Sequence, residues 1–210
     1  MKLIIFGPTG TIGSRILNEA LLRGHALTAV TRDPSRFSVS HEKLTVIAGN
    51  VLDPDMVADL VKDHDAVLSA IGSGGSSVET IAKAAHSLSN GLSRAGIRRL
   101  IVVGGAGTLE VAPGVQLVDS PNLVEAYRPL ALAHREAYNV YKASDLDWSF
   151  ICPAAEIAPG ERTGKFQVGA DHLLTNDRGE SRISAEDFAI AFMNEVEQPK
   201  YIHHRMTVAY

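Results

Sequence analysis

The chain has 210 residues, a formal net charge of −4, 45% hydrophobic and 21% charged residues, and one cysteine. This length suits a single α/β domain, residues 1–210, and the composition excludes a disordered chain. The slightly acidic balance gives no electrostatic footprint for nucleic acid or an anionic membrane, so we predict neither partner.

The single cysteine and the absence of a targeting segment bear on the compartment. Cys152 has no second cysteine to pair with, which suits a reducing environment. A strand is predicted from residue 2, which leaves no room for a signal peptide, and no apolar run approaches about 18 residues. We therefore predict a cytoplasmic protein.

The chain opens on an apolar stretch, residues 2–6, that is typical of a strand buried on both faces. Three glycines follow at spacing G-x-x-G-x-x-G and lead into a helix predicted over residues 11–23. Gly7 permits the bend, Gly10 lets the backbone approach a pyrophosphate, and Gly13 lets the helix pack on the strand. We predict a dinucleotide site here, with contacts from Gly7, Thr9, Gly10, Thr11, Ile12 and Gly13.

The second strand, predicted over residues 26–31, leads directly into Arg32 and Arg36. A dinucleotide fold meets the adenosine ribose at this position, where an acid selects NAD and an arginine clamps the 2′-phosphate of NADP. Asp33 lies beside Arg32, and surface arginines before a proline are common. The two arginines nevertheless favour NADP(H) over NAD(H).

A third strand, predicted over residues 44–48, leads into a loop where we expect Asn50 to meet the adenine amino group and Val51 and Leu52 to flank the ring. The same loop also reads as a cap for the next helix through Asp53, and both roles are compatible. The fourth strand, residues 65–71, ends in small residues that leave space for a cofactor ribose. The predicted contacts there are Ser69, Ala70, Ile71 and Gly72.

The remaining elements continue the alternation of strands and helices and predict a doubly wound parallel sheet. A glycine-rich opening at Gly104 follows the fifth strand, and residues 109–121 are predicted as an irregular loop acting as a lid. The predicted elements are a helix 77–95, a strand 98–103, a helix 123–144, a strand 147–152, a helix 184–197 and a strand 203–209.

Two groups on the helix at 123–144 are candidates for chemistry. Tyr138 and Lys142 have the spacing of a pair in which a lysine lowers the pKa of a tyrosine, but they lie near the helix end that leads away from the cofactor. His134 lies one turn earlier and is better placed to face a nicotinamide. A half-buried helix histidine without a catalytic role is the alternative.

Seven segments resemble the atypical short-chain dehydrogenases of the NmrA-like and biliverdin reductase B-like group. The later segments are similar to the putative NADH-flavin reductases of bacteria within that group, and the likeness covers essentially the whole chain. The segments are residues 7–13, 31–35, 103–107, 147–155, 159–164, 183–189 and 207–210.

This resemblance implies a Rossmann-type fold with bound NAD(P), loss of tyrosine–lysine catalysis, and a small C-terminal substrate lobe formed mostly by residues 153–183. In this resemblance, His134 matches the helix position of the usual active-site residue. Three residues of the resembling segments would border the nicotinamide: Pro153, Ala154 and Ala155.

Three functional hypotheses remain open at this point. The first is an NADPH-dependent reductase that transfers hydride to a flavin or quinone-like acceptor, a task that needs ring alignment more than acid–base groups. The second is a non-catalytic NAD(P) sensor with a protein partner, and the third is a sugar-nucleotide epimerase or dehydratase. The histidines are scattered, so we predict no metal site, and oligomeric state is left open.

Overall fold

The computed structural model describes residues 1–73 and 77–210, except for the Arg36 side chain. Within these residues, eight strands form one sheet in the order β10-β12-β8-β5-β4-β1-β2-β3. Every neighbouring pair is parallel except β10 with β12. The strands are β1 (Lys2–Phe6), β2 (Ala26–Thr31), β3 (Leu44–Ala48), β4 (Ala66–Ser69), β5 (Arg99–Val103), β8 (Asp147–Cys152), β10 (Gln167–Gly169) and β12 (His204–Ala209).

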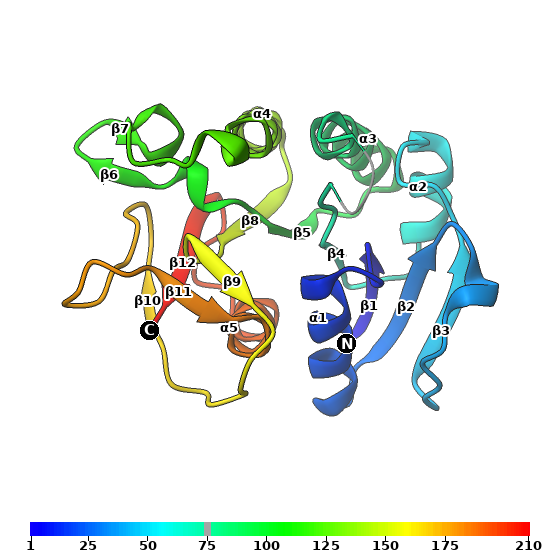
Figure 1. Ribbon diagram of the computed structural model, residues 1–210. Coiled ribbons are helices and arrows are strands. Elements are labelled where there is room, and N and C mark those ends of the chain that lie inside the picture. The colour runs from blue at the N-terminus through cyan, green and yellow to red at the C-terminus, as the bar shows by residue number, and fades with distance from the viewer. Residues whose placement is uncertain (74–76) are drawn as a thin grey trace.

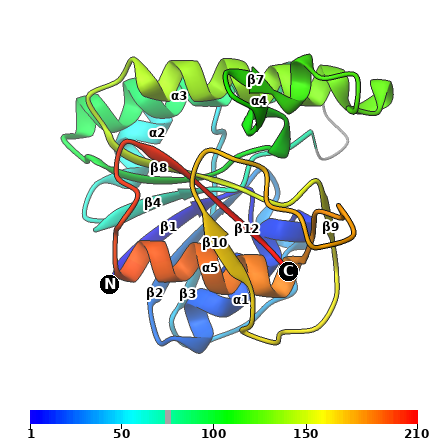
Figure 2. The ribbon, with the colours of Figure 1, turned by 90° about the vertical axis from the view of Figure 1, so that its left-hand side faces the viewer.

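Helices cover both faces of this sheet (Figure 1). On one face lie α1 (Thr11–Leu22) and α5 (Ala185–Glu197), and on the other lie α2 (Pro54–Val61), α3 (Glu79–Ala95) and α4 (Arg128–Lys142). In Figure 2, α5 lies behind β10 and β12, on the face of the sheet where its residues share an apolar cluster with those of β12. The predicted doubly wound, Rossmann-type α/β fold is therefore confirmed.

The chain reverses its direction of travel across the sheet next to β1. It passes from β1 outward to β2 and β3, and then returns to β4 on the other side of β1 before continuing to β5 and β8. The loops that leave β1 and β4 therefore diverge, and ligands of open α/β sheets bind at such a switch point, outside the carboxyl ends of the strands. The glycine-rich turn lies at this point.

The core consists of two apolar layers, one on each face of the sheet. In β1, Leu3 and Ile5 pack into the layer under α1 and α5, whereas Ile4 and Phe6 pack into the layer under α3 and α4. Because both faces are covered, this strand is apolar at successive positions, as the sequence predicted.

Two predicted elements differ in the structure. The predicted irregular loop at 109–121 contains a hairpin of β6 (Glu110–Ala112) and β7 (Val115–Gln116), followed by a 3-10 turn at Leu117–Asp119. The helix predicted from residue 123 begins at Arg128, after a 3-10 turn at Glu125–Tyr127. Pro129 explains the later start, because proline lacks an N–H and fits only the first turn of a helix.

The C-terminal part of the chain completes the sheet and adds a small parallel pair. The predicted last strand is present as β12, one residue later than expected because His203 adopts a left-handed φ of 61°. The added pair consists of β9 (Glu156–Ala158) and β11 (Arg182–Ser184). These strands and β10 fall within or beside residues 153–183, which we call the lobe; its role in binding a substrate stays a prediction.

Candidate cofactor site

The glycine-rich turn has the close packing expected from its sequence. Gly7 has a φ of +84°, and an added Cβ there would lie 2.5 Å from the carbonyl oxygen of Ala70. A Cβ at Gly13 would lie only 1.9 Å from the carbonyl oxygen of Gly7, so helix α1 rests directly on the turn. Gly10 is different, since its Cβ would meet only Gly7 O, at 3.9 Å. Packing requires glycine at positions 7 and 13 and leaves space at position 10.

The open space beside Gly10 faces a helix start with free donors. Gly10 is the N-cap of α1, and it supplies no side-chain hydrogen bond. The backbone N–H groups of Thr11, Ile12 and Gly13 donate to no acceptor among the residues that the structure describes. Free N–H groups and the helix dipole together favour an anion such as a pyrophosphate, and no Cβ blocks its approach.

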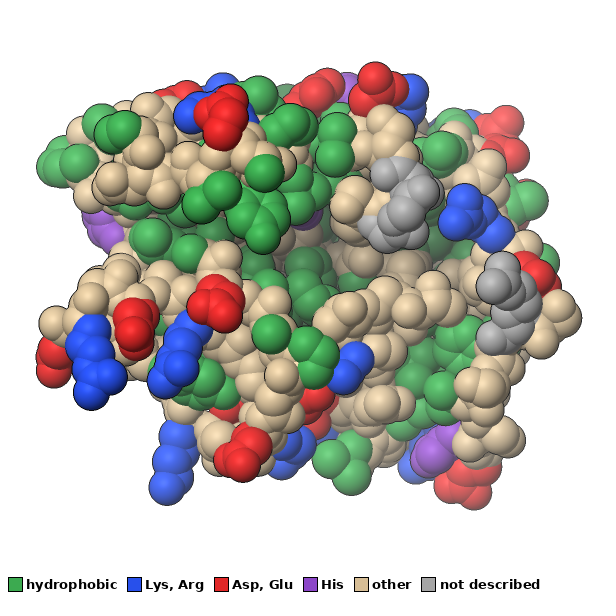
Figure 3. Space-filling view, viewed as in Figure 1, with side chains coloured by type: hydrophobic (Ala, Val, Ile, Leu, Met, Phe, Trp, Pro, Cys, Tyr) green, Lys and Arg blue, Asp and Glu red, His purple; other side chains and the backbone are tan. Residues whose placement is uncertain are grey.

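A cavity of about 810 Å³ lies at this switch point. The ends of β1, β2, β3 and β4 line it, together with the start of α3. Figure 3, viewed from the same side as Figure 1, shows a hollow across this face, between the layer with α3 and α4 and the layer with α1 and β9. The predicted contacts that line the cavity are Gly7, Thr9, Gly10, Thr11, Arg32, Asn50, Val51, Ala70, Ile71 and Gly72.

Arg32 lines the cavity at the end of β2, is exposed, and forms no ion pair or hydrogen bond with any side chain that the structure describes. Asp33, the neighbouring acid, is engaged locally. Its Oδ1 accepts hydrogen bonds from the backbone N–H and the hydroxyl of Ser35, at 3.1 and 2.6 Å. The cation is thus available to a ligand, while the acid caps a 3-10 turn. The Arg36 side chain, also predicted as a contact, lies outside the described part of the chain.

The loop after β3 combines two roles. Asp53 accepts hydrogen bonds from the backbone N–H groups of Asp55 and Met56, at 3.0 and 3.1 Å, so the predicted helix cap is confirmed. Asn50 lines the cavity, and its Oδ1 accepts the backbone N–H of Leu52 at 3.1 Å. That bond fixes the Asn50 side chain and leaves its NH₂ group for a ligand.

The other predicted contacts do not line this cavity. Ser69 is 2% exposed inside the sheet, and Ala154 is 1% exposed. A Cβ at Gly104 would lie 2.3 Å from the ring of Phe150, so close packing accounts for that glycine. Their contact with a cofactor therefore stays a prediction, as it does for the full set: Ile12, Gly13, Ser69, Gly104, Pro153, Ala154 and Ala155.

His134 is more deeply buried than the half-buried position considered from the sequence, and it does not line the cavity. It is 8% exposed, and an added Cβ at Gly105 would lie 2.8 Å from its ring. Its Nδ1 is buried and has no hydrogen-bond partner among the described residues. Burial lowers the pKa of His134 to about 4, so the imidazole is neutral at neutral pH.

Tyr138 and Lys142 form a packing arrangement. The Lys142 Nζ lies 5.2 Å from the centroid of the Tyr138 ring, and the guanidinium of Arg205 lies 5.1 Å from it. The ring also makes edge contact with Trp148, with centroids 5.7 Å apart. Burial raises the pKa of Tyr138 and outweighs the opposing charge of Arg205. This tyrosine is therefore not activated as an acid or base by its lysine.

Several lining residues were not among the predicted contacts. Thr31 and Asp33 flank the predicted arginine, and Gly49 precedes the predicted Asn50, so adjacency in the sequence was their only signal. Thr80 comes from α3, and nothing in its local sequence points to the cavity. Leu52, which was expected beside the adenine, also lines the cavity. The full set of residues that were not predicted is Phe6, Pro8, Val30, Thr31, Asp33, Gly49, Ser73 and Thr80.

Comparison with known proteins agrees with this geometry. The family model for NAD(P)H-binding proteins matches residues 7–199, which begins at the first glycine of the turn. The chain belongs to this family. Its fold is accordingly that of an NAD(P)H-binding oxidoreductase, and the resemblance found in the sequence is confirmed at that level.

Solved structures of similar proteins superpose over the whole chain. A putative exported protein from Burkholderia pseudomallei is 46% identical, with all of both chains covered and a TM-score of 0.92. A putative epimerase from Bacteroides thetaiotaomicron is 37% identical, covering 100% of this chain and 96% of that one, with a TM-score of 0.91. A putative NADH-flavin reductase from Streptococcus pneumoniae is 29% identical, covering 100% and 99%, with a TM-score of 0.89.

In the described part of the chain, none of the helices has the length and apolar character needed to span a bilayer.

Proposed function

We propose that this family member is an NADPH-dependent reductase that transfers a hydride to a flavin or quinone-like acceptor. The proposal rests mainly on one observation: two groups that can each bind an anion line the same cavity. The free helix N-terminus at Gly10 suits a pyrophosphate, and Arg32 suits a 2′-phosphate. The similarity to a putative NADH-flavin reductase supports the class of acceptor.

Cofactor preference rests on the contrast between Arg32 and Asp33. A guanidinium binds a phosphate through paired, charge-assisted hydrogen bonds, whereas the carboxylate that would bind an unmodified ribose already accepts two bonds from Ser35. We therefore propose that NADPH binds more tightly than NADH.

The acceptor is proposed to lie in the continuation of the hollow towards the lobe (Figure 3). The segment that leads into α4 exposes two large apolar side chains, Val124 at 62% and Tyr127 at 61%. Apolar and aromatic surfaces suit a planar ring system, which they hold by stacking and by exclusion of water.

When bound, the reduced nicotinamide supplies a hydride, that is, two electrons and one proton, and the acceptor takes its second proton from solvent. The protein then has to align two rings and exclude water between them. His134 does not line the cavity, and we propose it only as a neutral, buried hydrogen-bond donor on the acceptor side of the site, one that cannot act as a cationic acid at neutral pH. Acid–base chemistry by Tyr138 is not part of the proposal.

The deciding experiment follows NADPH and NADH oxidation at about 340 nm, with FMN, FAD and a simple quinone as acceptors. Acceptor-dependent oxidation that favours NADPH is expected. Tight NADPH binding without oxidation by any acceptor would instead support a cofactor-sensing protein. Conversion of a nucleotide sugar would support the epimerase hypothesis, against which the packed Tyr138 argues.

We also propose a cytoplasmic location. Cys152, the single cysteine, is buried, and burial raises the pKa of its thiol to about 11, so it stays protonated and unreactive. Fractionation of the native host tests this, with the protein expected in the cytoplasmic fraction.

A further inference from the structure

Residues 159–164 cross from the lobe to the cofactor helix without regular secondary structure. Their side chains are exposed, so apolar burial does not hold them in place. Backbone groups are bound instead. Glu186 accepts the N–H of Gly160 at 2.7 Å, and Asp187, which is fully buried, accepts the N–H groups of Thr163 and Gly164 at 2.8 Å each. Hydrogen bonds to the start of α5 therefore hold the backbone of this segment in place.

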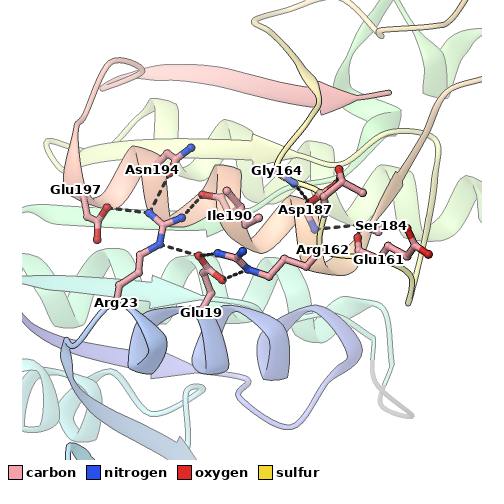
Figure 4. A network of polar contacts seen from close by, with 11 residues as sticks. Glu19, Arg23, Glu161, Arg162, Gly164, Ser184, Asp187, Ile190, Asn194 and Glu197 are labelled. Atoms are coloured by element: carbon pink, nitrogen blue, oxygen red, sulfur yellow. Dashed lines mark hydrogen bonds and ion pairs between the residues drawn. The ribbon is translucent and has the colours of Figure 1, made fainter.

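Arg162 ties the same segment to α1 (Figure 4). Its Nε and Nη2 donate to the two carboxylate oxygens of Glu19, both at 3.0 Å. Glu19 is 4% exposed and also accepts from Arg23 at 2.8 Å. Burial works to raise the pKa of the Glu19 carboxyl, and the bonds and charges of the two arginines outweigh it, so the pKa lies below its ordinary 4.5.

A second contact repeats this connection nearer to the glycine-rich turn. Arg15 on α1 forms an ion pair with Glu186 at 2.9 Å, and the other oxygen of Glu186 holds Gly160. The helix whose N-terminus faces the cavity, the start of α5 and the segment at 159–164 are therefore joined in one polar network.

We propose that residues 159–164 form a strap that holds β9 against the cofactor helix, and that Arg162 is its positioning residue. The strap joins β9 to β10 along the chain, and β10 is already fixed by its pairing with β12 in the main sheet. The attachment of the strap to α1 therefore sets where β9 and its partner β11 stand relative to the cofactor. The role in aligning an acceptor rests on the proposed reductase function. The attachment itself does not.

Arg162 can be removed without dismantling the helix pair beneath it. Glu19 keeps its bond to Arg23, and Arg23 keeps its bonds across to α5, with Asn194 at 2.9 Å and Glu197 at 2.8 Å. Loss of the Arg162 guanidinium therefore removes the two bonds from the strap to α1, while the bonds of the strap to the start of α5 and the pairing of α1 with α5 remain.

Cleavage after Lys165 by a lysine-specific endoproteinase measures the attachment, because this exposed site lies just beyond the strap and the protease does not cut after Arg162, as trypsin would. The fragment ending at Lys165 is followed by mass spectrometry in the wild type, Arg162→Ala, Arg162→Gln and Arg98→Ala. Arg98 pairs with Asp147 through two bonds of 3.0 and 3.1 Å at the amino-terminal ends of the central strands β5 and β8, away from the strap, which makes it a matched control.

We expect Arg162→Ala to raise the initial cleavage rate about tenfold, because cleavage follows the population of the open segment. Arg162→Gln, whose amide can still donate a hydrogen bond to Glu19, should recover part of the protection, and Arg98→Ala should match the wild type. Equal cleavage rates for the wild type and Arg162→Ala would overturn the strap.

The positioning role is read from kinetics with an acceptor that the wild type reduces. Arg162→Ala should raise the acceptor KM by about tenfold while the Kd for NADPH changes less than about twofold. Faster cleavage with an unchanged acceptor KM would overturn the positioning role and leave only the strap. Absence of turnover in the wild type would remove the reductase function and this role together, and the cleavage assay would still decide the attachment.

Discussion

The cofactor region and the lobe are held together by different forces. Around β1 and the glycine-rich turn, apolar strands lie buried between two helical layers, and glycine positions are required by backbone contacts within a short stretch of chain. The lobe has short strands and exposed segments, and only a few of its side chains, such as Ile183, reach the apolar core. Charged groups from distant parts of the chain, such as Arg162 on Glu19, add to its attachment.

The difference has a consequence for function. A buried, close-packed site keeps its geometry without a ligand, which suits a cofactor that is recognised by fixed backbone donors. A lobe held by polar contacts can be adjusted or released at small free-energy cost, which suits the side of the site that admits different acceptors.

The largest expected effect on stability comes from a substitution that disrupts the close packing of the cofactor region. Gly13→Ala places a Cβ at 1.9 Å from the Gly7 carbonyl oxygen, and we expect the free energy of unfolding to fall by about 3 kcal/mol. Gly10→Ala is the matched control on the same turn. It should unfold like the wild type in urea yet bind NADPH more weakly, and equal stability of the two variants would contradict the packing argument.

A second prediction concerns His134, which is buried on α4 against Gly105. Its folded pKa of about 4 lies below the ordinary 6.5, so the unfolded chain binds more protons between these values and stability falls as pH drops from 6.5 towards 4. This contribution amounts to about 2 kcal/mol between about pH 7 and pH 4.5. His134→Gln should show a correspondingly smaller pH dependence in urea unfolding, and an identical pH dependence would show that the imidazole is not held neutral.

The third prediction sharpens the account of cofactor choice. Arg32→Ala should raise the Kd for NADPH about tenfold, equivalent to about 1.4 kcal/mol, because one charge-assisted phosphate contact is lost. The Kd for NADH should change little. Fluorescence titration of both cofactors measures this, and equal weakening of both would remove the 2′-phosphate assignment.

The smallest expected effect is on stability at acid pH, and it concerns Glu19, which binds Arg162 of the lobe. The pKa of Glu19 is lowered in the folded state, so its stabilising contribution is present above about pH 4.5 and is lost as pH falls through the folded pKa. Glu19→Gln should therefore flatten the loss of stability below that pH. Thermal unfolding scans across this range test it, with Arg98→Ala as the control, and an unaltered acid profile would count against the ion pairs.

The elements that were predicted well depend on neighbours in the sequence. The apolar run of β1, the glycine spacing and the Asp53 cap each act within a few residues, and the structure has all three. The cavity then gathers most of the predicted cofactor contacts because strand ends meet at the switch point.

The elements that were missed depend on partners far away in the chain. The hairpin at β6 and β7 is stabilised beside the lobe, where the Glu110 N–H donates to the carbonyl of Asp171 at 2.8 Å. Arg205 on β12 pairs with the Asp171 carboxylate at 2.6 Å, and Arg162 reaches Glu19 across 143 positions. No local sequence pattern predicts contacts between residues so far apart in the chain.

The sequence by itself determined the order of strands and helices, the glycine-rich turn and the presence of an arginine where a ribose phosphate would lie, because periodicity and backbone sterics are local properties. The tertiary structure alone decided that Arg32 lines one cavity with the glycine-rich turn, that His134 is buried and neutral, and that the lobe is strapped to α1. Those outcomes depend on which charges and surfaces folding brings together, and desolvation and pairing are set only by that arrangement.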